Sequence, residues 1–312
     1  MKTKFAIGCL VQWYECDIIE EYVDSLKNAI SEYGGQVICD FTILGNQDLE
    51  KCTTKSQLNE CIEKIKTICN FGNVRYIDDL HTIADYRREF NVNYCDDVDV
   101  LVWGESDMLA PKQMFTVLDS LHNNIPITKY LATFGICKMW DDSWKLLEHI
   151  DFTDKPFIEG DNKNWWNIPY TMNIDEMNAF NSKVEELNVI QIQPHKFNGC
   201  GLIISSEVIK SGVNIPKSSF FIHEDTSFMI MTQKILGNIP QYHFKNILMV
   251  HNRKHPNKRN YVLGEEKEYL DSQRKSNKWY NIANKMCIQN NNNLFNPNYK
   301  SLIWKDVWNS IK

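Results

Sequence analysis

Residues 97–107 read DVDVLVWGESD, an apolar run that ends on two acidic residues. Apolar side chains dominate from Val98 to Trp103, which predicts a buried strand. Glu105 and Asp107 follow at the carboxyl end of that strand, where open α/β sheets bind their ligands. On their own the two acids are explained equally well by a solvated turn, because acidic residues, Ser and Pro are common in loops. Whether they form a site depends on what else the chain brings to this edge.

Strands and helices alternate in the sequence before this stretch. Apolar runs predict strands, and apolar residues at helical spacing predict helices, in the order 4–12 (strand), 18–33 (helix), 36–44 (strand), 58–68 (helix), 73–78 (strand) and 83–94 (helix). Strands separated by helices of this length form βαβ units. We therefore expect an α/β fold with a single Rossmann-type, mixed and mostly parallel sheet flanked by helices.

The second half of the chain is less regular. A helix is predicted at 111–123 and a strand at 129–140, but periodicity weakens between residues 151 and 198. That region mixes polar and aromatic side chains, which suits sugar recognition as well as a folded-over core flap: Asp161, Asn162, Asn164, Trp165, Trp166, Asn167 and Tyr170. The remaining elements predicted are a helix at 223–237, a strand at 242–252 and a helical tail from residue 262, broken by the Asn-rich run 289–298.

Composition predicts one core with an appended C-terminal part. The 312 residues can bury a full core, and the formal charge of −6 gives no general indication of a nucleic acid or an anionic membrane as partner. No run approaches the roughly 20 apolar residues of a membrane span, and the short apolar stretch after Lys4 lacks a signal-peptide cleavage site. Ten cysteines without a C-x-x-C pair favour a reducing compartment. We expect a cytoplasmic protein without a membrane span.

Four short motifs occur in an order that resembles GT-A fold glycosyltransferases, which transfer sugars from nucleotide-sugar donors. They are Glu105-Ser106-Asp107 for the acid-x-acid metal motif, Gly199-Cys200-Gly201 for the glycine-bearing loop, His223-Glu224-Asp225 for the x-Glu-Asp motif that opens a helix, and His251 for the late metal-binding histidine. The helix at 84–94, ADYRREFNVNY, also resembles the family's Arg- and Asn-containing helix. Each motif alone is weak, and their joint order is the stronger signal. The resemblance covers roughly residues 4 to 260.

The resemblance implies a GT-A-like glycosyltransferase domain at 1–261, with a nucleotide-binding half at 1–111 and an acceptor and catalytic half at 112–261. Residues 262–312 would be a helical C-terminal extension.

The resemblance also implies a divalent ion, Mn²⁺ or Mg²⁺, that stabilises the departing diphosphate. Asp107 would supply a carboxylate ligand and His251 an imidazole. Glu105 stands where the common pattern has Asp, so we expect it to act less directly, through water or the ribose.

The remaining implied roles concern the donor and the reaction. Asp225, beside Glu224 at the start of a helix, would be the base that takes the proton from the acceptor hydroxyl. The residues expected to contact the donor are Arg88, Glu105, Asp107, Gly199 and Gly201. Arg253 and Lys258 belong to a local basic cluster with Lys254 and Arg259, which is explained either by a solvated loop or by contacts to the departing diphosphate. For the histidines His195, His223 and His255, a hydrogen-bonded structural role is the more common one.

The expected activity is metal-dependent sugar transfer from a nucleoside-diphosphate sugar, by resemblance a UDP-sugar, with inversion at the anomeric carbon. The acceptor stays open among glycans, small molecules, proteins and modified nucleic acids. One alternative is a sugar-phosphate nucleotidyltransferase, but AIGCLVQWYECD, residues 6–17, lacks the Gly-rich, Arg-containing phosphate loop of that family. A second alternative is a catalytically inactive nucleotide-sugar-binding module.

Overall fold

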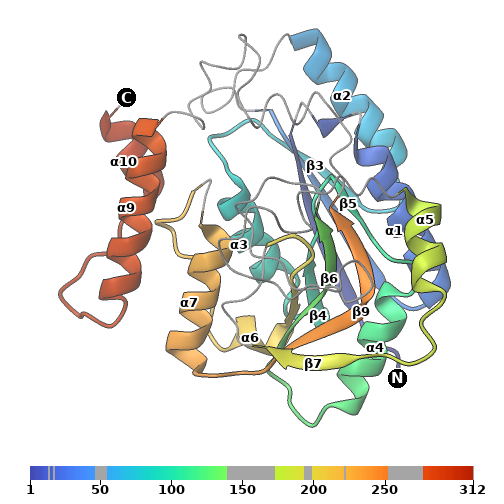
Figure 1. Cartoon of the computed structure of the whole chain (residues 1–312). Coiled ribbons are helices and arrows are strands. Elements are labelled where there is room, and N and C mark those ends of the chain that lie inside the picture. Colours follow the sequence, from blue (N-terminus) through green and yellow to red (C-terminus); the bar gives the residue numbers. More distant parts are fainter. Residues whose placement is uncertain are drawn as a thin grey trace, which may run out of the picture.

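A central sheet with helices on both faces forms the body of the protein (Figure 1). The structure is a computed structural model that describes residues 1–12, 15–16, 18–45, 55–138, 173–192, 199–220, 223–251 and 277–311. Its strands are β1 (Phe5–Gln12), β2 (Val37–Leu44), β3 (Asn73–Ile77), β4 (Val100–Trp103), β5 (Met108–Leu109), β6 (Leu131–Lys138), β7 (Val189–Ile192), β8 (Ile203–Ser205) and β9 (Gln241–His251). Its helices are α1 (Ile19–Tyr33), α2 (Lys55–Ile68), α3 (Ile83–Tyr94), α4 (Met114–Asn124), α5 (Ile174–Asn181), α6 (Ser206–Lys210), α7 (Glu224–Leu236), α9 (Asn277–Asn293) and α10 (Trp304–Ile311).

The sheet is mixed and mostly parallel, with strand order β3-β2-β1-β4-β8-β6-β9-β5 and β7 paired to β9. The pairs β1–β2, β1–β4, β2–β3 and β6–β9 are parallel. The short strand β8 is antiparallel to both β4 and β6, so β4, β6 and β9 run in the same direction. The predicted fold class is confirmed, and the carboxyl ends of β4 and β9 lie at the same edge.

Each face of the sheet has its own apolar core. Helices α1, α2 and α4 cover one face, and α3, α6 and α7 cover the other (Figure 1). Every residue of β1 is buried, because a strand in the middle of a doubly covered sheet has no solvent face. The same explanation holds for β4, whose four residues are all buried.

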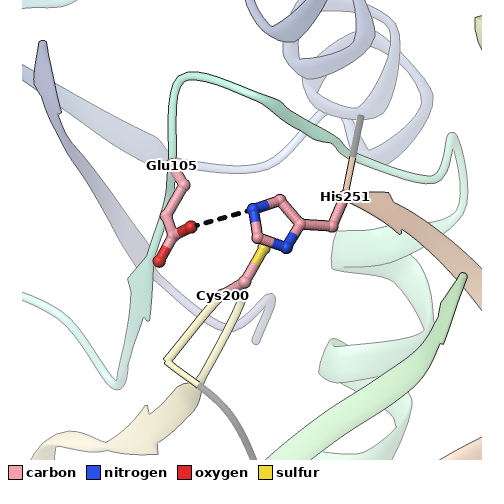
Figure 2. Close-up of side chains that lie close together, drawn as sticks. All are labelled: Glu105, Cys200 and His251. Carbon is pink, nitrogen blue, oxygen red and sulfur yellow. Dashed lines mark ion pairs between the residues drawn. The ribbon is translucent and has the colours of Figure 1, made fainter. Parts of the chain in front are cut away.

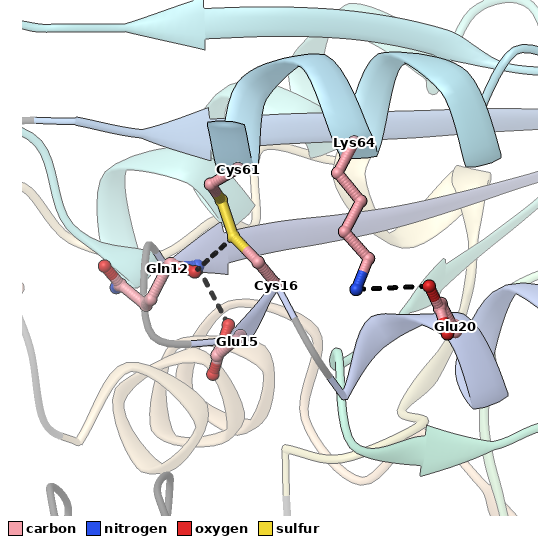
Figure 3. Close-up of a disulfide and its surroundings, with 6 residues drawn as sticks. All are labelled: Gln12, Glu15, Cys16, Glu20, Cys61 and Lys64. Atoms are coloured by element: carbon pink, nitrogen blue, oxygen red, sulfur yellow. Dashed lines mark hydrogen bonds and ion pairs between the residues drawn. A yellow bond between two sulfur atoms is a disulfide. The ribbon is translucent and has the colours of Figure 1, made fainter. Parts of the chain in front are cut away.

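A disulfide joins the segment after β1 to helix α2. It pairs Cys16 with Cys61, at a Cα–Cα distance of 5.6 Å (Figure 3). Beside it the backbone N–H of Gln12 donates to Glu15. The disulfide differs from the reduced cysteines that a reducing compartment leads one to expect. Among the residues that the structure describes, six other cysteines are reduced and buried, and Cys9, Cys39 and Cys95 among them were expected in the core.

The C-terminal helices α9 and α10 form a separate small apolar cluster together with Phe220, which precedes α7. Its buried members are Phe220, Ala283, Met286, Trp304 and Trp308. A helical C-terminal part is therefore observed. The expected domain boundary at residue 261 lies outside the described residues and stays a prediction. No helix in the described part of the chain is long and apolar enough to cross a membrane.

Two expectations about secondary structure differ from what the structure shows. Helix α5 and strand β7 lie in the stretch where no element was predicted, although Asn173 and Glu176 form a capping box at the start of α5. Helix α9 also continues to Asn293, through half of the Asn-rich run that was expected to break it. Asn290 and Asn291 are buried there, and the Asn291 carbonyl accepts a bond from Lys234 of α7. Packing against α7 thus overrides the weak helix propensity of Asn.

Candidate functional site

The acid pair and the late histidine meet because β5 pairs with β9. After β4 ends at Trp103, the chain turns, and the Met108 N–H donates to the Glu105 carbonyl at 3.0 Å. In the antiparallel β5–β9 ladder Met108 lies opposite His251, the last residue of β9. Asp107 precedes Met108, so this register brings both acidic residues beside the imidazole.

His251 lies between two carboxylates. Its Nε2 is 3.3 Å from Glu105 Oε2 and 3.3 Å from Asp107 Oδ2. The Glu105 side chain is 22% exposed, whereas that of Asp107 is 0% exposed. The site therefore opens to solvent on the Glu105 side, and Asp107 forms its inner wall.

Burial and charge act in opposite directions on the pKa values of this cluster. Burial alone lowers the pKa of His251, but the charge and hydrogen bond of Asp107, and then Glu105, outweigh it and raise that pKa above its ordinary value. Burial alone raises the pKa of Glu105, but the hydrogen bond to His251 and the charge of Arg87 bring that pKa down to about 2. The two carboxylates therefore favour the protonated form of the His251 imidazole.

Cys200 completes a group of potential metal ligands. One ligand atom from each of Glu105, Cys200 and His251 lies within 4.8 Å of the others (Figure 2). A carboxylate, a thiol and an imidazole converging on one point are a donor set that divalent transition metals accept. The residues present therefore fit a divalent ion. The sequence predicts Asp107 as the direct ligand and Glu105 as the less direct one, whereas this group contains Glu105.

Arg87 is the buried cation of the site. Its Nη2 lies 2.7 Å from Glu105 and its Nη1 lies 2.8 Å from Glu224, and its guanidinium stacks 4.8 Å from the Trp103 ring centroid. Nη2 also donates to the Gly199 carbonyl at 3.3 Å. One side chain therefore connects the acid pair, the glycine loop and the start of α7.

The expected donor contact from Arg88 is not part of this cluster. Arg88 pairs with Asp85 at 2.7 Å and donates to the carbonyls of Ile215 and Pro216. Consecutive residues of a helix point about 100° apart, so Arg87 and Arg88 face different neighbours. The Arg-containing helix was identified from the sequence, but Arg87, and not Arg88, is the arginine that contacts Glu105 and Glu224.

The two glycines of the 199–201 loop are required by close packing. A Cβ at Gly199 would lie 2.7 Å from Arg87 Nη1 and 3.3 Å from the Cβ of Asp225. Gly201 has a φ of +67°, and its N–H donates to the Trp103 carbonyl at 2.9 Å. A left-handed backbone at Gly201 and a crowded Gly199 explain both residue choices. The expected approach of this loop to a sugar stays a prediction.

Glu224 and Asp225 form the first turn of α7, as expected for an x-Glu-Asp motif. His223 precedes them in a left-handed conformation, with φ of 61°, and is the one non-glycine residue with positive φ in the described part of the chain. Burial, and then the charge of Asp225, raise the pKa of Glu224 to about 7, although Arg87 lowers it. Asp225 adjoins the glycine loop, so the acid expected to be the base lies beside the loop expected to contact the sugar.

Several residues singled out from the sequence, as site residues or as structural histidines, lie outside the described residues. They are Arg253, Lys258, His195 and His255, together with the aromatic and polar residues from Asp161 to Tyr170. Arg87 and Cys200 are the members of the cluster that the sequence analysis did not assign. Cys200 stood inside a motif chosen for its glycines, and Arg87 was one position from the arginine chosen.

The sequence matches no protein-family model and no curated protein sequence. Similar solved structures include S. aureus TarS 1-349 in complex with UDP-GlcNAc, with 11% identity and a TM-score of 0.47 over 81% of this chain. This chain spans 59% of that TarS chain. Another is Mycobacterium tuberculosis glucosyl-3-phosphoglycerate synthase in complex with Mn²⁺, UDP and glucosyl-3-phosphoglycerate, with 13% identity and a TM-score of 0.45, covering 87% of this chain and 80% of that chain.

Proposed function

We propose that the protein is a metal-dependent glycosyltransferase that uses a nucleoside-diphosphate sugar, with UDP as the nucleotide. The observation that carries the proposal is the position of His251 Nε2, 3.3 Å from a carboxylate of Glu105 and 3.3 Å from one of Asp107, at the carboxyl edge of the sheet. Open α/β sheets bind nucleotides at this edge. A diphosphate leaving group needs its developing charge neutralised there.

Glu105 and His251 would hold the ion, and Asp107 would hold His251. A divalent ion at this site supplies a positive charge that stabilises the departing diphosphate. Asp107 is fully buried, and its Oδ2 lies 3.3 Å from the same Nε2 that faces Glu105, so its negative charge would stabilise the ion and position the imidazole from the inner side of the site. This assignment reverses the order expected from the sequence for the two acids. Arg253 and Lys258 stay predicted contacts of the diphosphate.

Asp225 would act as the base for the acceptor hydroxyl. It lies in the first turn of α7, next to Gly199, while its neighbour Glu224 is fixed by Arg87. The Arg87 bridge connects this turn to Glu105, so the base and the donor site keep a constant separation. A single base and one in-line displacement invert the anomeric carbon, an outcome that proton NMR of the product can check.

The experiment for the metal is calorimetry of UDP binding with Mn²⁺ and with a chelator. We expect tighter binding with Mn²⁺, a severe loss of the Mn²⁺ effect in Glu105→Gln, and a loss of about 10–100-fold in metal affinity in Asp107→Asn. Glu207→Gln, on the exposed part of α6, is the matched control and should keep the effect. Equal UDP affinity with Mn²⁺ and with chelator would remove the metal from the mechanism.

A further inference from the structure

We infer that Cys200 is a thiolate ligand of this metal site, which gives the site a preference for Zn²⁺ and Co²⁺ over Mg²⁺. The inference rests on the proposed function only for the presence of a divalent ion between Glu105 and His251. It adds a donor of a different chemical class, sulfur, to a site that otherwise offers oxygen and nitrogen.

The geometry places the Cys200 sulfur within reach of a shared ion. The sulfur, a Glu105 carboxylate oxygen and a His251 ring nitrogen lie within 4.8 Å of one another (Figure 2). In tetrahedral coordination, a metal–sulfur bond of about 2.3 Å and a metal–nitrogen bond of about 2.1 Å place the two ligand atoms about 3.6 Å apart. Side-chain movements of about 1 Å therefore bring the three ligand atoms to bonding distance of one ion.

The backbone around Cys200 holds this side chain in place. Gly201 bonds to the Trp103 carbonyl at the end of β4, and Gly199 packs on Arg87, so both neighbours are fixed. The loop then enters β8, which pairs with β4. Cys200 thus lies just before β8, and Glu105 lies just after the neighbouring strand β4.

A buried cysteine is usually a small core residue. Whether Cys200 is a core residue or a metal ligand therefore depends on which atoms surround its sulfur. Cys200 is 0% exposed and touches the apolar core, as do Cys9 and Cys39. In the described part of the chain, Cys200 is the cysteine whose sulfur is grouped with a carboxylate and an imidazole. That polar pair distinguishes it from the other buried thiols.

A thiolate changes which ion the site selects. Mg²⁺ prefers oxygen ligands in octahedral geometry, whereas Zn²⁺ and Co²⁺ accept a mixed set of sulfur, nitrogen and oxygen in tetrahedral geometry. When such an ion binds, the Cys200 thiol gives its proton to solvent and the sulfur bonds to the ion. Three protein ligands leave one position open, which a diphosphate oxygen can occupy.

The test is the absorption spectrum of the full chain titrated with Co²⁺. We expect visible d–d bands together with a near-ultraviolet band from thiolate-to-cobalt charge transfer. Cys200→Ser should lose the near-ultraviolet band and keep the d–d bands. Cys287→Ser, which changes another buried reduced cysteine outside the ligand group, should keep both. Competition of Zn²⁺ and of Mg²⁺ with bound Co²⁺ then gives the ratio of the affinities for Zn²⁺ and Mg²⁺. We expect this ratio to be smaller in Cys200→Ser than in the wild type.

Wild-type protein alone can overturn the inference, so it does not depend on whether the variant folds. Co²⁺ bound by the wild type without a near-ultraviolet band would exclude Cys200 as a ligand and leave the metal site standing. A band that persists in Cys200→Ser would exclude it equally. If the wild type retains no Co²⁺ in equilibrium dialysis, both this inference and the proposed metal are overturned. UDP binding in chelator, measured in parallel, reports on the nucleotide site independently.

Discussion

Arg87 shows how one residue can join separate motifs. It is buried between Glu105 and Glu224, stacks on Trp103 and bonds to the glycine loop. Arginine suits this position because its planar guanidinium can bond two carboxylates and stack on a ring at once. Each motif was recognisable in the sequence, but the side chain that connects them was not.

Replacing each of the two neighbouring arginines by lysine separates their roles. Arg87→Lys keeps the charge but loses the fork that bridges the two acids, so we expect donor turnover to fall by at least about tenfold, equivalent to a loss of about 1.4 kcal/mol in transition-state stabilisation. Arg88→Lys, which weakens contacts to Asp85 and to two carbonyls, should reduce the melting temperature with a much smaller effect on turnover. The measurements are initial rates of donor hydrolysis and thermal unfolding of both variants. Equal losses of turnover would mean that Arg87 has no special role.

Some site residues could be predicted from the sequence, and others depend on contacts that the sequence does not reveal. Glu105 and Asp107 were singled out because they follow a predicted strand, and Glu224 and His251 because their motifs resemble those of GT-A fold glycosyltransferases. Which of Arg87 and Arg88 faces the acids depends on the rotation of α3 about its axis, which is set by packing on β1 and β4. Cys200 was not predicted as a ligand, because it lies in a motif that was recognised by its two glycines.

At the scale of elements, the C-terminal helix α10 fastens the helix that carries Arg87. Trp304 Nε1 donates to the Asp85 carboxylate at 3.1 Å, and its ring stacks on Phe220 at a centroid distance of 5.1 Å. Asp85 belongs to the capping box of α3 with Thr82, and it also pairs with Arg88. A residue near the end of the chain therefore stabilises the start of α3.

A double-mutant cycle measures this contact. Trp304→Phe keeps the aromatic ring and removes the N–H donor, so we expect a loss of about 1.5–3 kcal/mol in the free energy of unfolding, the usual range for a hydrogen bond to a charged group. The same change in an Asp85→Asn background should cost clearly less. Urea unfolding of the four proteins gives the coupling energy. A coupling within about 0.5 kcal/mol of zero would show that the two residues act independently.

The predictability of elements depended on strong periodicity. The helix expected at 83–94 has the bounds observed for α3, because an apolar stripe and a capping box define it. Helix α5 was missed although Asn173 and Glu176 provide its capping box, since its eight residues are too few for a clear period. The end of α9 could not be predicted, because contacts with α7 and not local propensity hold Asn290 and Asn291.

At the scale of the whole molecule, buried thiols make the fold sensitive to alkaline pH. Burial raises the pKa of Cys39 and of Cys69 from 9.0 to about 12. Above pH 9 the unfolded chain loses these protons while the folded chain keeps them, so stability falls as pH rises from 9 towards 12. Each thiol should cost about 1.4 kcal/mol at pH 10.

Urea unfolding between pH 8 and pH 10 can test this, with Cys39→Ala compared to the wild type. The variant starts from a lower stability because it leaves a cavity, but its stability should decline less steeply with pH. Identical slopes would mean that Cys39 ionises as readily in the folded protein as in the unfolded chain.

The overall architecture was predictable because alternating strands and helices of this length leave few topologies. The antiparallel position of β8 and the β5–β9 pairing could not be predicted, since a strand of two or three residues has no period to detect. Those two short pairings bring Cys200 and Asp107 into the site. The irregular part of the fold is therefore also the part that assembles the proposed chemistry.

Donor turnover is the most direct test of the central claim, that the protein is a metal-dependent glycosyltransferase with Asp225 as its base. A panel of nucleotide sugars is incubated with the protein and Mn²⁺, and release of nucleoside diphosphate is followed, because water can replace the acceptor. We predict slow hydrolysis of a UDP-sugar that stops with chelator, and a rate about 10²-fold lower in Asp225→Asn, the usual contribution of a positioned base, with UDP affinity retained. UDP binding without hydrolysis of any nucleotide sugar would contradict the account and indicate a binding module.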